Sequence, residues 1–224
     1  VIDTAAKINE KQDTLQLMRD MLNVNGKSNV LLNPQVEQKY KALNCNIEVV
    51  SPAQFKEMKD YIEKSVVRGS RVKVKNIWKI QRAKEHEAFA KDIGNNKLLF
   101  HGSAVKNWVG ILSRGLLLPK IVVTLGVHRT DAGWLGNGIY FGDAACTAQN
   151  YAHPGKRGTR FMTVANVALG KIKDYRKITY GLKEPPPGYD SCHGVRGSNS
   201  DFSDDEFVIY EHNQQKLEYL VEFS

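Results

Sequence analysis

The sequence predicts an α+β domain in which mostly antiparallel strands are accompanied by short helices. From about residue 71 to the C-terminus, alternating or continuous apolar runs of strand length recur. The helical patterns between these runs are short and do not alternate with the strands as regular βαβ units. The chain has 224 residues, 42% of them hydrophobic, which suffices for one core and a small appendage. We therefore expect a helical segment over residues 1–68 and one α+β domain over residues 69–224.

The N-terminal segment is predicted to begin with an amphipathic helix over residues 4–24. Its apolar residues recur at helical spacing, and the Asn-Gly pair that follows is typical of a helix end. A short helix after Pro34 and a strand over residues 46–50 are expected next.

Residues 51–67 form the clearest helical pattern of the chain. Ser51 and Gln54 have the spacing of a capping box, and Pro52 suits the first helical position. Gly69 is expected to end this helix. Its apolar stripe consists of Phe55, Met58, Ile62 and Val66.

The α+β domain is predicted to contain five clear strands and two short helices. Ser103 is expected to cap the first of these helices and Gly115 to end it. A long loop rich in Pro, Gly, Ser and Asp is expected over residues 183–206. The strands are expected over residues 71–82, 97–102, 161–172, 206–211 and 216–223, and the helices over residues 105–115 and 144–152.

The net charge of +8 is concentrated in residues 66–84, which are rich in Lys and Arg and contain no acid. Such a segment could bind a polyanion such as nucleic acid. The alternative, which we favour, is that the alternating lysines occupy the solvent-facing side of an edge strand and oppose aggregation there.

Composition argues against a membrane span, a disulfide framework and a metal site. No apolar run approaches the roughly 20 residues that cross a bilayer. The three cysteines are far apart and have no histidine at ligand spacing. This pattern favours a reducing compartment, cytoplasmic or nuclear.

Three motifs in fixed order carry the functional information. They are LLFHGS at residues 98–103, GWLGNGIYFGDAACTAQNY at 133–151 and DDEFVIY at 204–210. Each is weak alone, since a histidine at a strand end or a Gly-x-Gly turn has many structural explanations. In combination, order and spacing resemble the catalytic domain of the poly(ADP-ribose) polymerase family from about Val72 onward. RGLLLPK at residues 114–120 and PPPGYDSCHGV at 185–195 resemble the vault subfamily in particular.

The resemblance implies the ADP-ribosyltransferase fold, with split antiparallel-rich sheets, and NAD as the donor substrate. His101, Tyr140 and Glu206 match the catalytic His-Tyr-Glu triad. His101 would donate a hydrogen bond to a ribose hydroxyl of NAD, on the adenosine side. Glu206 would stabilise the positive charge that develops on the nicotinamide ribose when the glycosidic bond breaks.

Four further positions match the NAD-binding residues of the family. Gly102 matches the residue whose backbone holds the nicotinamide carboxamide, and Tyr151 matches the tyrosine that stacks on the nicotinamide ring opposite Tyr140. Ser103 and Asn107 match positions near the adenosine. Residues 119–135 match the loop that covers NAD, with Trp134 and Asp131 as candidate contacts.

Two departures from the family pattern affect the expected function. Ala148 stands where the family usually has a serine that bonds the carboxamide, with Thr147 beside it. Losing that bond is expected to weaken binding by about 0.5–1.5 kcal/mol. Residues 1–68 resemble a reduced or truncated form of the helical regulatory subdomain, so the NAD cleft is expected to be open without DNA.

The sequence thus predicts an enzyme that transfers ADP-ribose from NAD to protein acceptors, with single transfer and polymer synthesis both left open. A catalytically idle module that binds NAD or ADP-ribose is the alternative, and the retained Glu206 argues against it. The other five histidines are interpreted as ordinary structural or solvated residues.

Overall fold

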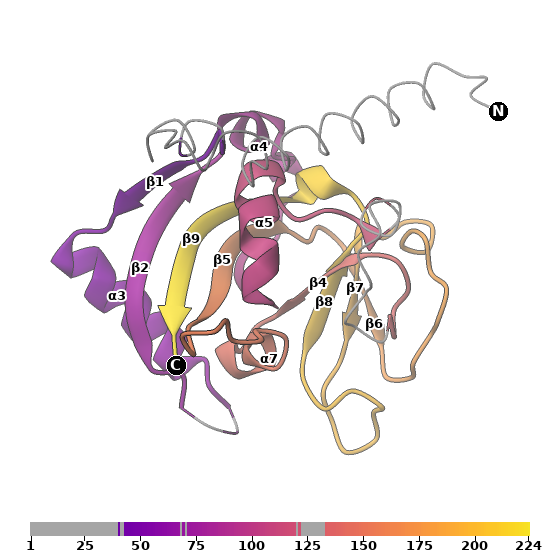
Figure 1. Cartoon of the computed structure of the whole chain (residues 1–224). Helices are drawn as coiled ribbons and strands as arrows, with labels where there is room; N and C mark the ends of the chain where they lie inside the picture. Colours follow the sequence, from indigo (N-terminus) through magenta and orange to yellow (C-terminus); the bar gives the residue numbers. More distant parts are fainter. Residues whose placement is uncertain (1–39, 41–42, 68, 70, 120, 122–132) are drawn as a thin grey trace.

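The computed structural model describes residues 40, 43–67, 69, 71–119, 121 and 133–224. The helices expected over residues 4–24 and after Pro34 lie outside these residues, as does Asp131. The described chain forms a nine-stranded sheet in the order β1-β2-β9-β5-β3-β4-β8-β7-β6. All neighbouring strands are antiparallel except β6 and β7, which are parallel. The α+β prediction is therefore confirmed (Figure 1).

The sheet has two halves that meet between β3 and β4. The printed register between these strands consists of the single pair Phe100–Gly142, whereas β3 pairs with β5 over its whole length. The first half comprises β1 (Asn46–Val49), β2 (Val74–Gln81), β9 (Gln215–Phe223), β5 (Arg160–Ala168) and β3 (Asn96–Ser103). The second half comprises β4 (Ile139–Gly142), β8 (Glu206–Ile209), β7 (Ser191–Gly194) and β6 (Ile172–Tyr175).

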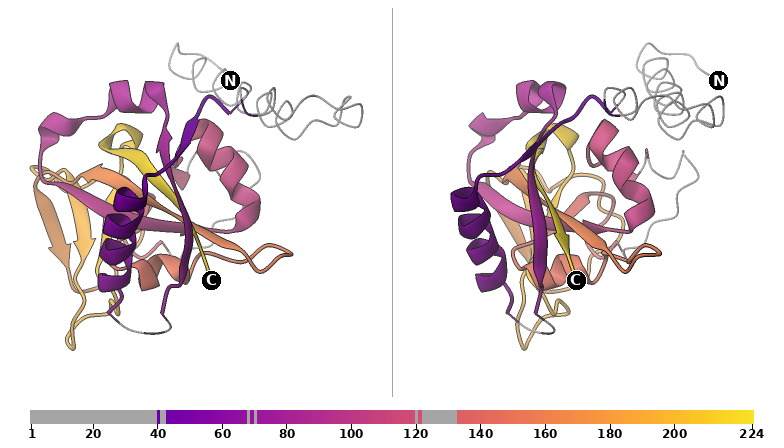
Figure 2. Two further views of the ribbon diagram at one scale, coloured as in Figure 1. Left: turned by 90° about the vertical axis from the view of Figure 1, so that its left-hand side faces the viewer. Right: turned by 60° about the vertical axis from the view of Figure 1, so that its left-hand side comes forward.

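Helices cover both faces of the sheet, as the views in Figure 2 show for α3 and α5. On one face, Trp108 and Leu112 of α5 pack in a cluster with Leu99. On the other face, α3 and α7 pack in a cluster around Phe100. The α-helices are α3 (Pro52–Lys64), α4 (Ala83–Ala88), α5 (Trp108–Arg114) and α7 (Ala145–Gln149). Short 3₁₀ turns lie at Lys91–Ile93, Val105–Asn107 and His212–Gln214.

The capping box of α3 is confirmed. The Gln54 backbone N–H donates to Ser51 Oγ at 3.3 Å, and Gln54 Oε1 accepts from the Ser51 N–H at 3.1 Å. The helix ends at Lys64, before Gly69, with Ser65 as the C-cap residue, whose hydroxyl donates to the Ile62 carbonyl at 2.7 Å. The prediction that Gly69 ends it is therefore wrong.

Three other local predictions are wrong. Ser103 does not cap a helix, because a 3₁₀ turn intervenes and α5 starts only after Asn107. The expected loop over residues 183–206 contains β7. The basic strand β2 is not an edge strand, since it lies between β1 and β9. Its lysines Lys75 and Lys79 are nevertheless exposed, as expected for a solvent-facing side.

The division of the chain at residue 68 stays a prediction. β1 and α3, which belong to the predicted N-terminal segment, contact the sheet: β1 pairs with β2, and Met58 and Ile62 of α3 are buried in the core. All three cysteines are free and buried. Among the described residues, no helix combines the length and apolar character needed to cross a bilayer.

Candidate active site

The three residues of the predicted triad lie on neighbouring strands, close to the point where the two halves of the sheet meet. His101 follows Phe100 on β3, and Phe100 pairs with Gly142 of β4. Gly142 in turn pairs with Glu206, the first residue of β8. Tyr140 pairs with Val208, two residues beyond Glu206, so the Tyr140 and Glu206 side chains share one face of the sheet. Pairing of distant segments thus gathers residues that are far apart in the chain.

The His101 ring is held by the backbone of β4. Its Nδ1 lies 2.8 Å from the carbonyl oxygen of Tyr140, and its edge meets the Phe141 ring at a centroid distance of 5.8 Å. Because a carbonyl can only accept, Nδ1 carries the hydrogen of this bond. This bond fixes the orientation of the ring at the end of β3.

The Tyr140 phenol is fixed by two hydrogen bonds to one turn. Its oxygen accepts from the Leu135 N–H at 2.9 Å and donates to the Gly136 carbonyl at 2.9 Å. Gly136 has φ +80°, and a Cβ there would lie 2.0 Å from the Leu182 carbonyl oxygen, so only glycine fits. The G-N-G turn therefore fixes the position of the Tyr140 ring.

Glu206 lies between two glycines, one on each flanking strand. It pairs with Gly142 of β4 and with Gly194 of β7. A Cβ at Gly142 would lie 2.8 Å from Thr147 Cβ, and one at Gly194 would lie 2.4 Å from the Phe202 ring. Paired residues point to the same face, so the half-buried Glu206 side chain extends between Thr147 and Phe202.

Thr147 brings a buried hydroxyl to the neighbourhood of Glu206. Its side chain is 4% exposed, and its Oγ1 has no hydrogen-bond partner among the described residues. A buried polar group is costly without a partner. The carbons of Thr147, Cβ and Cγ2, face Gly142, so the hydroxyl itself is shielded and would reach a bound molecule only after rotation of the side chain.

Gly102 is required by the packing of α7 on β3. A Cβ at this position would lie 1.8 Å from the carbonyl oxygen of Ala148. The Ala148 side chain is only 3% exposed, and Tyr151, half-buried, follows α7 with its N–H bonded to the Ala148 carbonyl at 3.2 Å. The close backbone approach therefore brings Tyr151 to the end of β3 that carries His101.

Ser103 and Asn107 are bonded to each other at the end of β3. The Asn107 amide donates to Ser103 Oγ at 3.0 Å, and Trp108 Nε1 donates to the Ser103 carbonyl at 3.1 Å. Both polar side chains are half-buried beside His101. Of the two candidates in the expected covering loop, Trp134 packs edge-on against Phe202 at 5.9 Å, and Asp131 lies outside the described residues.

A histidine that the sequence analysis interpreted as ordinary has two carboxylate partners next to this site. His193 of β7 bonds Asp174 of β6 and Asp205, the residue before Glu206. The partners are 19 and 12 residues away in the chain, so no local spacing indicated them. The one signal in the sequence was the acidic pair, Asp204 and Asp205, that precedes Glu206 in the DDEFVIY motif.

Asp143, directly after β4, has a raised pKa. Partial loss of hydration is the main cause, and the neighbouring Asp205 carboxylate raises the pKa further, while Arg196 and His193 lower it. The loops around Glu206 thus bring several carboxylates together with compensating cations.

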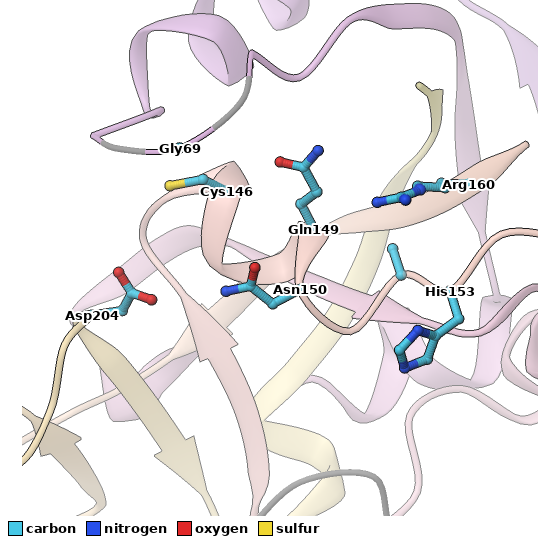
Figure 3. Close-up of a pocket in the computed structure, with 8 residues that line it drawn as sticks. Gly69, Cys146, Gln149, Asn150, His153, Arg160 and Asp204 are labelled. Carbon is cyan, nitrogen blue, oxygen red and sulfur yellow. The ribbon is translucent and has the colours of Figure 1, made fainter.

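A separate polar cavity of about 600 Å³ lies along the outer side of α7. As far as the described residues show, its lining contains none of the seven predicted site residues. Figure 3 shows Arg160 and His153 at one end of the lining and Asp204 at the other, with α7 between them. The remaining polar side chains of the lining are Cys146, Gln149 and Asn150.

Comparison with known proteins places this arrangement in a family. The family model for the poly(ADP-ribose) polymerase catalytic domain matches residues 53–204. The chain is 46% identical to Protein mono-ADP-ribosyltransferase PARP4 of Mus musculus over 222 residues, which are 96% of this chain and 11% of the relative. It is 45% identical to the Homo sapiens PARP4 over 221 residues, 96% of this chain and 13% of the relative.

The chain covers a larger share of a more distant relative. Poly [ADP-ribose] polymerase 2 of Homo sapiens is 25% identical over 264 residues, 99% of this chain and 44% of the relative. The chain thus spans about a tenth of the length of the two PARP4 proteins and less than half of this one. With the family model matched from the first turn of α3 to the residues before β8, the chain belongs to the poly(ADP-ribose) polymerase catalytic-domain family.

Proposed function

We propose that this chain is an NAD-dependent protein ADP-ribosyltransferase that attaches single ADP-ribose units to protein acceptors. The observation that carries the proposal is the position of Glu206. It lies between two glycines on the face it shares with Tyr140, beside the division between β3 and β4. A carboxylate in this position can act on a sugar that enters along the end of β3.

NAD is the donor substrate in this proposal, and residues at the end of β3 and after α7 hold it. His101, whose Nδ1 donates to the Tyr140 carbonyl, forms a hydrogen bond with a ribose hydroxyl on the adenosine side. Tyr140 and Tyr151 enclose the nicotinamide ring, and the Gly102 backbone bonds its carboxamide. Ser103 and Asn107, bonded to each other, lie on the adenosine side.

Ala148 contributes no hydroxyl to this set. Its side chain is buried on α7 at 3% exposure. The adjacent Thr147 has a buried hydroxyl with no hydrogen-bond partner among the described residues, and we propose that rotation of its side chain makes it a second polar contact near the reacting sugar. This neighbourhood is suited to a neutral polar ligand group.

The proposed reaction exchanges one bond at the ribose anomeric carbon for another. The bond to the nicotinamide nitrogen breaks, and its electron pair leaves with nicotinamide. Glu206 accepts a hydrogen bond from the 2′-hydroxyl and stabilises the positive charge on the ribose. The acceptor nucleophile then forms the new bond and releases its proton to a base or to water. Removing Glu206 is expected to slow this step by about two to three decades.

Single transfer is favoured over polymer synthesis by the relatives. The two PARP4 proteins, at 46% and 45% identity, are named mono-ADP-ribosyltransferases, whereas the relative named a polymerase is 25% identical. Nucleic acid is not part of the proposal, and the exposed lysines of β2 are explained as the solvated side of a strand.

Labelled NAD tests the proposal. The purified chain is incubated with labelled NAD as wild type, Glu206→Gln and the control Glu57→Gln, whose carboxylate is exposed on α3. Protein-bound label is then resolved by size. A discrete band that is lost only in Glu206→Gln is the expected result.

Two other results would overturn parts of the proposal. A smear of high mass that is lost in Glu206→Gln would mean polymer synthesis. Absence of label in the wild type, with NAD binding retained in calorimetry, would mean a catalytically idle binding module.

A further inference from the structure

Beside the strand that carries Glu206, a histidine lies between two carboxylates. His193 Nδ1 is 3.0 Å from an Asp174 carboxylate oxygen, and its Nε2 is 2.9 Å from one of Asp205. The His193 and Asp205 side chains are 16% and 18% exposed, whereas that of Asp174 is 69% exposed. The contact with Asp205 is therefore the shielded one of the two.

His193 contacts both chain neighbours of Glu206. Its Nε2 bonds Asp205, which precedes Glu206, and its ring stacks on Phe207, which follows, at a centroid distance of 4.3 Å and an interplanar angle of 3°. The register agrees, since His193 pairs with Phe207 and Gly194 pairs with Glu206.

Glu206 itself has only glycines opposite it. Side chains on neighbouring strands normally support one another across a sheet, and Gly142 and Gly194 offer none. The contacts of its chain neighbours Asp205 and Phe207 therefore matter for the backbone position of Glu206 at the start of β8.

We infer that His193 is a positioning residue for Glu206, acting through its hydrogen bond to Asp205 and its stacking on Phe207. The inference rests on the proposed function and deepens it. It gives His193 a role in the transfer reaction. The His193 ring lies on the opposite face of the sheet from the Glu206 side chain, so this role is indirect.

Other charged groups around the His193 ring show that its bond to Asp205 is the better fixed of its two hydrogen bonds. The Arg196 N–H donates to the same Asp205 oxygen at 3.0 Å, and Arg196 Nε lies 3.5 Å from the other one. Lys97 Nζ lies 5.3 Å from the centre of the Phe207 ring, and Asp143 is an electrostatic neighbour. Asp205 is thus held in place from two sides.

Two isosteric variants separate the bonds of the ring. His193→Gln puts an amide nitrogen near the place of Nε2 and keeps a donor for Asp205. His193→Asn puts one near the place of Nδ1 and keeps a donor for Asp174 only. Both variants lose the ring stacked on Phe207 and differ from each other by one methylene group, so their melting temperatures are compared together with their rates.

The steady-state rates of NAD-dependent transfer and the melting temperatures are measured for wild type and both variants. We expect His193→Asn to lower kcat roughly tenfold relative to His193→Gln, the size expected for loss of a hydrogen bond to a charged group. KM for NAD should change less than about twofold, because the end of β3 is untouched. The two variants should melt at the same temperature, and Asp174→Asn should keep the wild-type kcat.

Equal kcat values for His193→Asn and His193→Gln, in an active wild-type background, would overturn the inference alone. A kcat loss in His193→Asn that only follows a lower melting temperature would also overturn it, since the role would then be structural. A wild type without transfer activity would overturn the proposed function first, and the inference with it.

Discussion

Replacing Gly102 by alanine is expected to displace α7 from β3. The added Cβ would lie 1.8 Å from the Ala148 carbonyl oxygen, where a carbon and an oxygen normally approach to about 3.3 Å, so a shift of roughly 1.5 Å is needed. Neither side yields easily, because both contacting groups are backbone and Gly102 pairs with Met162 in the sheet. Overpacking typically costs about 1–3 kcal/mol, and we expect the upper end of that range.

Urea unfolding of Gly102→Ala against wild type measures this cost. The matched control is Gly110→Ala on α5, where an added Cβ meets no atom within 4 Å and is expected to stabilise by about 0.5–1 kcal/mol. Adding Ala148→Gly to Gly102→Ala should not restore stability, because the clash is with a backbone oxygen. A Gly102→Ala chain within about 0.5 kcal/mol of wild type would refute the packing argument.

Three further predictions concern single side chains. Tyr210→Phe should destabilise the fold by about 1–3 kcal/mol in urea unfolding, because the Tyr210 hydroxyl donates to the buried Leu135 carbonyl at 2.6 Å; unchanged stability would contradict this. Asp143→Asn should raise the melting temperature at neutral pH and not in acid, because a carboxyl whose pKa is raised by folding destabilises the native state once it ionises; an equal effect at both pH values would contradict it. Ala148→Ser should tighten binding of NAD or of a benzamide-type ligand by about 0.5–1.5 kcal/mol in calorimetry, and an unchanged affinity would show that the missing hydroxyl is not limiting.

Local sequence signals predicted the elements whose chemistry is local. The capping box of α3 depends on Ser51 and Gln54, three residues apart, and the structure contains both of its bonds. The strand at residues 97–102 was equally clear, because its apolar run is continuous. Position in the sheet was not predictable in this way. β2 looked like an edge strand from its lysines, yet β1 covers it through pairing with a segment of only four residues.

The candidate site residues were predicted from the order of three motifs, whereas their surroundings were not predicted. The sheet brings His101, Tyr140 and Glu206 onto neighbouring strands, as the motif order implied. The side chains beside Glu206 are visible only in the structure, because Thr147 and Phe202 occupy space above glycines. A glycine in a sequence does not say which distant residue fills its place.

The partners of His193 show the same limit. Asp174 lies on β6 and Asp205 directly before β8, and no local pattern in the SCHG segment predicts either contact. A histidine that looks ordinary in sequence can therefore belong to the support of a site through pairing between strands alone.

The central claim is that Glu206 acts on the transition state of a transfer from NAD. The most direct test compares the rate of nicotinamide release with the dissociation constant for NAD, in wild type and Glu206→Gln. The account predicts a rate lower by about two to three decades with a dissociation constant within about threefold of wild type. An unchanged rate would contradict the claim. A loss of NAD affinity large enough to explain the whole loss of rate would equally contradict it, since Glu206 would then only bind the substrate.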